Sequence, residues 1–233
     1  METMNREFFS PPALEVAPRL LGAKLTVRGA DGDDGDDGDV TIRITEVEAY
    51  HGVGTPGPYD AGSHSRDRRT ERNASMFGPP GHAYVYLSHG IHFALNLVCS
   101  PEGAASGVLI RSGALIAGAE IAARRRDAKR AAAAATTGRI PPTIPPASLA
   151  RGPGNLATAL GITRPLHNGL DLFAEPFALE LDTELAERVL AGPRVGVSGE
   201  AGGPAFPWRF WIPGEPSVSA YRPGRNVPRA AAR

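Results

Sequence analysis

Alternating apolar and polar residues make residues 40–50 the clearest strand of the chain. The apolar residues of Val40–Ile44 fall on one face, and strict alternation carries that face on to Glu46, Glu48 and Tyr50. The pattern predicts a core-facing apolar stripe that leads into two carboxylates, which are costly to bury without a partner or a purpose. Either the strand ends in a functional site, or a twist or bulge returns both glutamates to solvent. The alternation alone favours neither interpretation.

Weaker periodic signals predict several short strands and few helices. A helix should follow the Ser10-Pro11 cap and kink or end at Pro18, because proline lacks the N–H that a helix interior needs. The other expected elements are a helix from about Ala117 to Arg130, a helix opening at Gly152, and strands at Lys24–Arg28, Ala83–Leu87, His92–Cys99, Gly107–Arg111, Arg194–Val197 and Trp208–Ile212. The strand at Gly107–Arg111 ends abruptly in a guanidinium after an apolar run.

Three segments have compositions that are typical of poorly ordered chain. They are the aspartate- and glycine-rich loop 29–39, the alanine- and proline-rich linker 131–147 and the tail 222–233. The aspartate run resembles a calcium loop only weakly, and a solvated surface loop explains it better. A chain of 233 residues suits a single domain with a substantial hydrophobic core.

The composition is that of a globular protein, with 42% hydrophobic and 21% charged residues. A single cysteine, Cys99, excludes an internal disulfide and disfavours a cysteine-based metal site. No apolar run reaches the length of a membrane span, and the N-terminus lacks the layout of a signal peptide, so we expect a cytoplasmic protein. The formal net charge is zero, but six of the 25 acidic residues lie at 31–39. Without them 25 basic residues face 19 acidic ones, an excess that is compatible with phosphate contacts.

Ring-bearing side chains concentrate at residues 82–92, although aromatic residues make up only 6% of the chain. Tyr84, Tyr86 and His89 lie in a predicted hairpin there. A ribbon with rings around its turn can enter a nucleic-acid groove, but a packed core hairpin would have the same pattern. His89 and His92 would point to opposite faces of a hairpin, so they predict no shared metal site. The sequence also lacks the motifs of serine hydrolases, phosphate-binding loops and dinucleotide-binding folds.

Ten short segments carry a more specific signal. They are Glu46-Val-Glu-Ala-Tyr50, His64-Ser-Arg66, Thr70-Glu-Arg-Asn73, Met76-Phe-Gly-Pro-Pro-Gly81, Tyr84-Val-Tyr-Leu87, Asn96, Val108-Leu-Ile-Arg111, Gly152-Pro-Gly154, Arg194-Val-Gly-Val197 and Pro207-Trp-Arg-Phe210. In order and spacing these segments resemble the 3-methyladenine (alkyladenine) DNA glycosylase family. The resemblance covers most of residues 8–215, and ten ordered segments are far more specific than any one of them.

The resemblance implies an α+β fold, a single domain with a curved, mainly antiparallel sheet, surrounding helices and a protruding β-hairpin at 83–98 that enters the minor groove. It also implies base-excision repair, in which an alkylated purine is flipped out of double-stranded DNA and its N-glycosidic bond is hydrolysed. We therefore expect damaged double-stranded DNA as the partner. We further expect a monomer without a cofactor, a metal, a membrane or an obligate protein partner.

Each expected role follows from a position that matches the family's motifs. Glu48 would deprotonate the attacking water, and Arg111 and the backbone carbonyl of Val195 would help to hold that water. The rings that sandwich the flipped base would be Tyr50, His64 and Tyr86, and the pocket would be completed by Asn96 and Leu109. The expected DNA contacts are His89 at the hairpin tip and the loop arginines Arg66, Arg69 and Arg72.

The chemistry of the residues agrees with these roles. Alkylation at N3 or N7 makes a purine cationic, so electron-rich rings bind the base well. The same charge makes the base a good leaving group, and a general base matters more than a strong acid. A glycosylase that also cuts the strand needs an amine nucleophile. The only lysines, Lys24 and Lys129, lie outside every matched segment, which predicts no lyase activity, although the N-terminal amine leaves that question open.

Three positions depart from the family pattern and leave alternatives open. His89 replaces a tyrosine wedge, Glu71 replaces a proline, and Asn155 replaces a lysine or arginine, so binding to the DNA backbone should be weaker. One alternative is a catalytically inactive lesion- or structure-binding protein on the same fold, although binding alone requires neither Glu48 nor Arg111. Another is a helix-hairpin-helix glycosylase, suggested by the glycines around Pro153 but opposed by the strand-rich centre. The range of lesions depends on pocket dimensions that the sequence does not provide.

Overall fold

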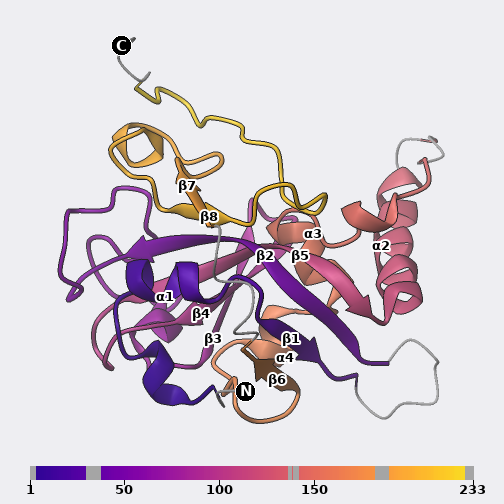
Figure 1. Ribbon diagram of the computed structural model, residues 1–233, viewed down its shortest axis with the longest axis horizontal. Helices are drawn as coiled ribbons and strands as arrows, with labels where there is room; N and C mark the ends of the chain where they lie inside the picture. The colour runs from indigo at the N-terminus through magenta and orange to yellow at the C-terminus, as the bar shows by residue number, and fades with distance from the viewer. Residues whose placement is uncertain (1–3, 30–37, 136–137, 139–141, 182–188, 229–233) are drawn as a thin grey trace.

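The structure is a computed structural model that describes residues 4–29, 38–135, 138, 142–181 and 189–228. Its centre is a curled, eight-stranded sheet with the order β3-β4-β5-β2-β1-β6, and β8 joins β2 to β7 (Figure 1). The strands are β1 (Lys24–Val27), β2 (Val40–His51), β3 (Ala83–Ser88), β4 (His92–Val98), β5 (Ser106–Ala117), β6 (Phe177–Glu180), β7 (Leu190–Gly192) and β8 (Arg209–Trp211). All the pairings between these strands are antiparallel. The predicted α+β fold with a mainly antiparallel sheet is confirmed, and the strand-rich centre rules out the helix-hairpin-helix alternative.

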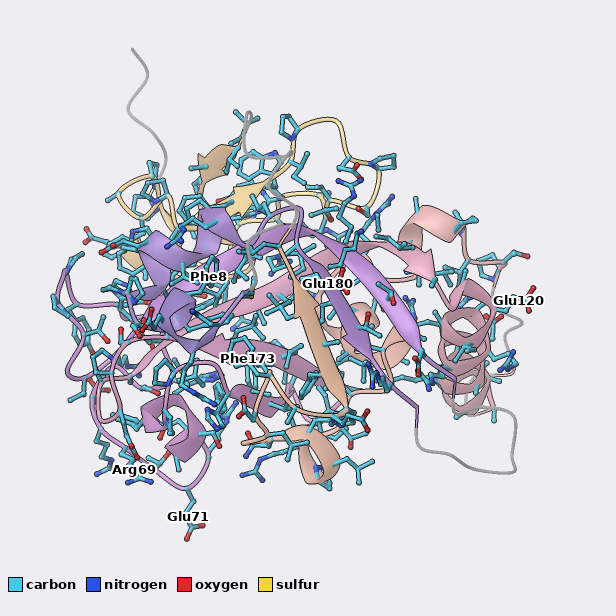
Figure 2. All side chains as sticks on the ribbon, turned by 60° about the horizontal axis from the view of Figure 1, so that its bottom comes forward. Phe8, Arg69, Glu71, Glu120, Phe173 and Glu180 are labelled. Atoms are coloured by element: carbon cyan, nitrogen blue, oxygen red, sulfur yellow. The ribbon has the colours of Figure 1, made fainter. Side chains whose placement is uncertain are left out.

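Few helices surround this sheet. They are α1 (Ala13–Arg19), α2 (Ala119–Ala134), α3 (Pro153–Ala159), α4 (Arg164–His167) and four short 3-10 helices at Arg6–Phe9, Ala74–Phe77, Pro146–Ser148 and Glu200–Gly202. α1 and α2 lie at opposite ends of the sheet in Figure 1. The long segment between β2 and β3 carries Arg69 and Glu71, which project outwards from the surface (Figure 2).

A bulge in β2 decides which way the site residues point. Its pairing with β5 shifts on either side of Glu46. Before the bulge the even-numbered residues of Val40–Ile44 join the main hydrophobic cluster, whereas after it the odd-numbered Val47 and Ala49 do. The bulge therefore turns Glu46 and Glu48 to the face opposite the core. The expected continuous stripe is wrong, and neither glutamate returns to solvent, because both are 0% exposed.

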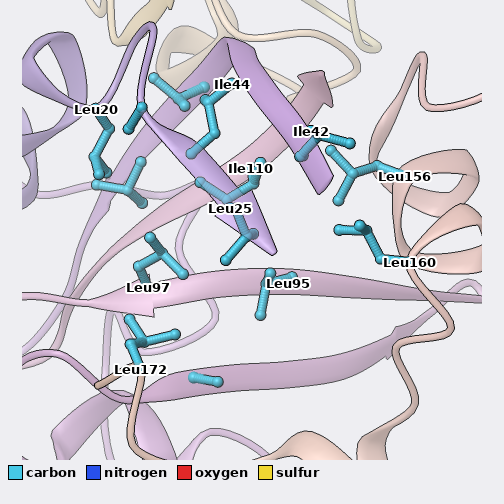
Figure 3. Packing of buried hydrophobic residues seen from close by; sticks show 14 of the residues in the cluster. Leu20, Leu25, Ile42, Ile44, Leu95, Leu97, Ile110, Leu156, Leu160 and Leu172 are labelled. Carbon is cyan, nitrogen blue, oxygen red and sulfur yellow. The ribbon is translucent and has the colours of Figure 1, made fainter. Parts of the chain in front are cut away.

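The hydrophobic core fills one face of the sheet. Its residues come from the strands and from α1 and α3, and they include Leu20, Leu25, Ile42, Leu95, Leu97, Ile110, Leu156 and Leu160 (Figure 3). Along β3, β4 and β5 every second side chain joins this cluster, as Val85, Leu95 and Val108 do. The side chains between them face the other way. This alternation leaves one face of three neighbouring strands free to build a site.

Several expected element boundaries differ from the structure. β5 does not end at Arg111 but continues to Ala117, because its second half pairs with residues 41–44 of β2. Residues 194–197 are not a strand, and the late strand pair is instead formed by β7 and β8. α1 begins at Ala13, so Ser10 does not cap it, and the helix ends one residue after Pro18 as expected. β6 and α4 have no counterpart among the predicted elements.

The low-complexity segments are also more structured than expected where they are described. The first residues of the expected linker 131–147 form the last turn of α2, which ends at Ala134, and residues 146–148 form a 3-10 helix. The tail 222–233 is held at its start, because the N–H groups of Gly196 and Gly199 donate to the carbonyls of Arg222 and Arg225. Most of the aspartate loop 29–39 lies outside the described residues.

Candidate active site

A cavity of about 670 Å³ lies on the free face of β2, β3, β4 and β5. Its floor is a row of residues in cross-strand register, in which Glu48 pairs with Leu109, Leu109 with Asn96 and Asn96 with Tyr84. The side chains that line it include Tyr50, His64, Arg72, Tyr84, Tyr86, His89, His92, Asn96, Leu109, Arg111, Asn155 and Val195. All but three of the predicted site residues line this cavity. Glu48 is fully buried behind the lining, in contact with Tyr50, Arg111 and Val195, and Arg66 and Arg69 lie elsewhere.

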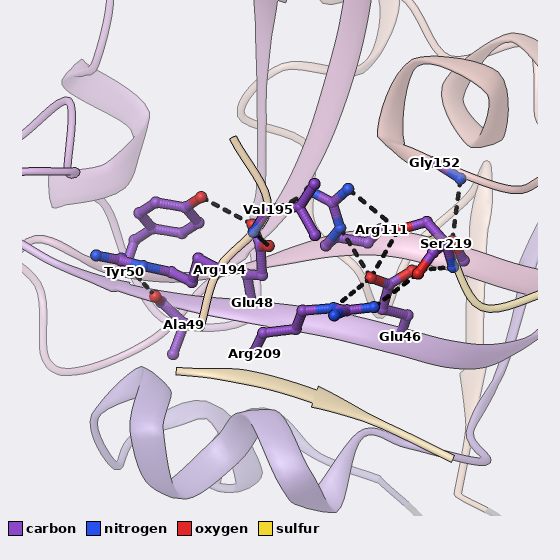
Figure 4. Close-up of polar contacts among 11 residues, drawn as sticks. Glu46, Glu48, Ala49, Tyr50, Arg111, Gly152, Arg194, Val195, Arg209 and Ser219 are labelled. Carbon is purple, nitrogen blue, oxygen red and sulfur yellow. Dashed lines mark hydrogen bonds and ion pairs between the residues drawn. The ribbon is translucent and has the colours of Figure 1, made fainter. Parts of the chain in front are cut away.

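Glu48 is buried directly behind the lining of this cavity and is held by three donors. The hydroxyl of Tyr50 donates to its Oε2 at 2.8 Å, the N–H of Val195 donates to its Oε1 at 2.7 Å, and Arg111 Nη1 lies 3.3 Å from Oε2 (Figure 4). Burial and the nearby carboxylate of Glu48 raise the pKa of Tyr50 well above its usual value, so its hydroxyl stays a donor. The expected role of Val195 concerned its carbonyl, whereas the observed contact is made by its N–H.

A second buried carboxylate, Glu46, was not among the predicted site residues. It accepts hydrogen bonds from Arg111 Nε at 3.1 Å, Arg209 Nε at 2.7 Å, Ser112 Oγ at 2.8 Å, and the N–H and hydroxyl of Ser219, both at 2.8 Å (Figure 4). Burial alone would raise the pKa of Glu46, but Arg111 and Arg209 outweigh burial and hold that pKa below its usual value. The alternation of β2 indicates that both glutamates are unusual carboxylates at the end of an apolar stripe. Only their partners in the folded chain distinguish the two.

The predicted ring set lies around the cavity. The rings of His64 and Tyr86 meet edge to face with centroids 4.6 Å apart, and Tyr84 stacks on Tyr86 at 5.5 Å. Tyr50 lies on β2, at the opposite end of the cross-strand row from Tyr84 and Tyr86 on β3. Although His64 as a residue is exposed, surrounding protein and the charges of Arg72 and Arg66 lower the pKa of its ring to about 4. The imidazole is therefore neutral near pH 7.

The loop that carries His64 is tied down by a buried amide. Asn73, 1% exposed, donates from Nδ2 to the carbonyls of His64 and Arg68, and its Oδ1 accepts from the N–H of Thr70. This anchor was part of a matched segment but had no predicted role. It holds the cationic loop in one shape, which is what a fixed pocket wall requires.

The three loop arginines occupy different places. Arg72 lies at the cavity, with its guanidinium 5.7 Å from the centre of the Tyr86 ring and Nη2 3.5 Å from His64 Nε2. Arg66 faces away from the cavity and contacts Asp67 and the carbonyl of Ala61. Arg69 is exposed and forms no ion pair within the part of the chain that the structure describes. Only Arg72 is thus brought next to the predicted base-stacking rings.

The hairpin between β3 and β4 ends in a tight turn at His89 and Gly90. Both residues have positive φ, 50° and 71°, and the N–H of Ile91 donates to the carbonyl of Ser88. Two successive left-handed residues are typical of a type I′ turn, and histidine is one of the few side chains that adopt this conformation readily. His89 is exposed at the cavity rim, and Ile91 beside it is 63% exposed.

A buried ion pair supports the cavity from behind. Arg194 and Asp60 are both fully buried, and Nη1 and Nη2 of Arg194 reach the two Asp60 oxygens at 2.8 and 2.6 Å. The guanidinium also lies 4.4 Å from the centre of the Tyr50 ring (Figure 4). Asp60 in turn accepts from the N–H of Gly62, which lies in the cavity wall two residues before His64. One ion pair therefore connects the Tyr50 side of the cavity with the loop of His64.

The described residues contain no group of three or more metal-ligating side chains, and none of their helices is long and apolar enough to cross a membrane. Neither lysine lines the cavity. Lys24 lies on β1, and the Nζ of Lys129 contacts Nδ1 of His92, a lining residue, at 3.1 Å and Thr158 at 3.3 Å.

Comparison with known proteins agrees with this arrangement. The model of the methylpurine-DNA glycosylase family matches residues 7–216. The chain belongs to this family. Proteins named "putative 3-methyladenine DNA glycosylase" are similar over nearly their whole length, one from Leifsonia xyli with 48% identity over 94% of this chain and 92% of its own. Another from Streptomyces avermitilis is 46% identical over 94% and 92%, and one from Mycobacterium tuberculosis is 43% identical over 98% and 99%. The methylpurine-DNA glycosylase family is thus the family whose resemblance the ten short segments indicated.

Proposed function

We propose that this chain is a monofunctional DNA glycosylase that flips alkylated purines, such as 3-methyladenine, out of duplex DNA and hydrolyses the N-glycosidic bond. The observation that carries the proposal is Glu48, a carboxylate buried directly behind the lining of a cavity walled by rings. An ionised carboxylate accepts about four hydrogen bonds. Tyr50 and Arg111 occupy Oε2, whereas among the described residues Oε1 receives only the N–H of Val195. Oε1 is therefore the atom that we expect to accept the proton of the attacking water.

The walls of the cavity support a cationic substrate. Neutral rings attract a cationic base through their π faces, and a protonated histidine would repel it. Because the pKa of His64 is lowered to about 4, this ring is neutral near pH 7. Asn96, whose Nδ2 donates to the carbonyl of Tyr84, and Leu109 form the floor against which the edge of the base would rest. The range of accepted bases should be set by these two side chains and Tyr86.

The hairpin tip and the loop supply the expected DNA contacts. His89 lies at the rim of the cavity, where we expect it to fill the gap that a flipped nucleotide leaves, and exposed Ile91 adds apolar surface beside it. Arg69 and Arg66 are exposed and can reach phosphates, and Arg72 can do so from the cavity mouth. Neither Lys24 nor Lys129 is among the residues that line the cavity, and the Nζ of Lys129 is held by His92 and Thr158, which supports hydrolysis without strand cleavage.

Release of methylated purines from dimethyl-sulfate-treated DNA tests the proposal. Wild type should release them, and Glu48→Gln, which keeps the shape but not the basicity, should lower the single-turnover rate by roughly 10²–10⁴-fold. Glu102→Gln, at an exposed glutamate outside the cavity, is the matched control and should keep full activity. DNA binding by Glu48→Gln should persist. Folded wild type that binds lesion DNA but releases no base would refute catalysis and favour the lesion-binding alternative.

A further inference from the structure

Glu46 is more thoroughly paired than the candidate general base itself. It is 0% exposed, and its two oxygens accept from five donors on β5, β8 and the segment around Ser219. A buried carboxylate with two arginine partners is costly to assemble and gives no advantage in stability over an apolar cluster. No part of the proposed hydrolysis uses Glu46 directly, so its burial calls for another explanation.

The explanation lies in the arginine that Glu46 shares with Glu48. Arg111 donates a hydrogen bond from Nε to Glu46 at 3.1 Å, whereas its Nη1 makes only an ion pair with Glu48 at 3.3 Å. Its remaining nitrogen, Nη2, donates to the hydroxyl of Ser219 at 3.3 Å. A guanidinium that met Glu48 alone would turn to form two parallel hydrogen bonds with it. The bond to Glu46 instead holds Arg111 so that a single nitrogen, Nη1, lies against Glu48.

We propose that Glu46 is a positioning residue that keeps Glu48 basic by holding Arg111 in a shared ion pair. This inference rests on the proposed role of Glu48 as the general base. Glu46 and Glu48 face Arg111 and Arg209, so the four formal charges cancel. Without the charge of Glu46, Arg111 would engage Glu48 in a bidentate pair. That pair would occupy both oxygens and lower the affinity of Glu48 for a proton.

The groups that face Glu48 determine the direction of the effect. They are Tyr50 on β2, Tyr86 on β3, Arg111 on β5, Arg209 opposite Glu48 in register on β8, and Arg194 with the N–H of Val195 from the loop that follows β7. Both tyrosines stay neutral because burial raises their pKa values, so the charge balance is set by the arginines and Glu46. Removing Glu46 leaves an excess positive charge, and removing Arg209 leaves an excess negative charge.

The test is the pH dependence of single-turnover base release from methylated duplex DNA. Glu46→Gln keeps the side-chain shape, and it should lower the maximum rate by about tenfold and move the acid limb of the profile to lower pH. Arg209→Gln should move the same limb to higher pH. A loss of packing alone would slow both variants without moving the limb in opposite directions. Ser112→Ala, which removes one neutral donor to Glu46 but no partner of Arg111, should leave the limb in place.

The outcomes separate this inference from the proposed function. If Glu48→Gln abolishes release but Glu46→Gln and Arg209→Gln both keep the wild-type acid limb, the role of Glu46 is overturned and that of Glu48 remains. If Glu48→Gln retains the wild-type rate, both are overturned. Should Glu46→Gln fail to fold, the Arg209→Gln profile decides, since an upward shift supports the shared pair and an unshifted limb contradicts it.

Discussion

The ion pair between Arg194 and Asp60 offers the sharpest test of how the cavity is supported. Both side chains are 0% exposed, and within the part of the chain that the structure describes the guanidinium otherwise donates to the carbonyls of Ala49 and Ala201, each at 3.0 Å. Asp60→Asn changes one atom and removes the negative charge. The variant would leave a buried guanidinium among two carbonyls and the rings of Tyr50 and Trp208. No other described carboxylate forms an ion pair with Arg194.

The size of the effect follows from burial. Removal of one partner from a fully buried ion pair costs about 3–5 kcal/mol, because the other charge stays desolvated. Asparagine can still accept from the N–H of Gly62, so we expect the lower end, about 3 kcal/mol. For a chain of this size each kcal/mol lowers Tm by about 2–4 °C, so Tm should fall by roughly 6–12 °C. Arg194→Met added to Asp60→Asn should recover part of the loss, since a neutral buried cluster has no unpaired charge.

Urea unfolding at equilibrium, followed by tryptophan fluorescence, measures these differences. The matched control is Glu175→Gln, which breaks the ion pair between Glu175 and Arg28. The Arg28 side chain is 48% exposed and the Glu175 side chain is 76% exposed. That change should cost no more than about 1 kcal/mol, because solvent screens an exposed pair. A cost for Asp60→Asn as small as that of the control would refute the reasoning. So would a double variant that is less stable than Asp60→Asn alone.

Three further predictions concern the cavity and the DNA-facing surface. The His64 ring should titrate with a midpoint near pH 4, so its protonation should weaken binding of a cationic base only as the pH falls toward 4. An NMR titration, with the His64 signal assigned from its loss in His64→Gln, measures this midpoint. A midpoint near the usual 6.5 would contradict the prediction. His89→Tyr should bind lesion-containing duplex more tightly, because a tyrosine ring offers more stacking area than an imidazole, and equal affinities of the two proteins at one pH and salt concentration would exclude residue 89 from the DNA interface. Arg69→Gln should reduce the salt dependence of DNA binding by about one charge, whereas Glu71→Gln should strengthen binding at low salt. If neither variant changes the slope of log affinity against log salt concentration, this loop is excluded from the DNA interface.

Local patterns in the chain were sufficient for most of the sheet. The strands at β1, β2, β3 and β4 were predicted within one or two residues, because each combines apolar alternation with clear turn residues at its ends. β6 and β7 were missed, since each spans only three or four residues and gains its hydrogen bonds from distant partners. Arg194–Val197 has the composition of a strand, yet Arg194 is committed to Asp60 and the backbone of Val195 to Glu48.

The three arginines expected to contact DNA show that neighbours in the sequence can point in different directions. Arg66, Arg69 and Arg72 are close in sequence and had one predicted role, but the loop held by Asn73 turns Arg72 into the cavity and leaves Arg69 in solvent. A cationic run carries no information about the direction of its individual side chains. That direction depends on which backbone carbonyls the buried amide of Asn73 selects.

The residue pattern alone predicts that β2 ends in two carboxylates and a phenol and that rings gather at the next hairpin, and it identifies the family. The orientation of the site depends on tertiary contacts. The bulge at Glu46 exchanges the faces of β2, and the partners of Glu46 lie between 65 and 173 residues away in sequence. Alternation records only local preference, whereas register, burial and shared ion pairs depend on segments that meet only when the sheet closes. For that reason the two glutamates look alike in the sequence but have different partners in the folded chain.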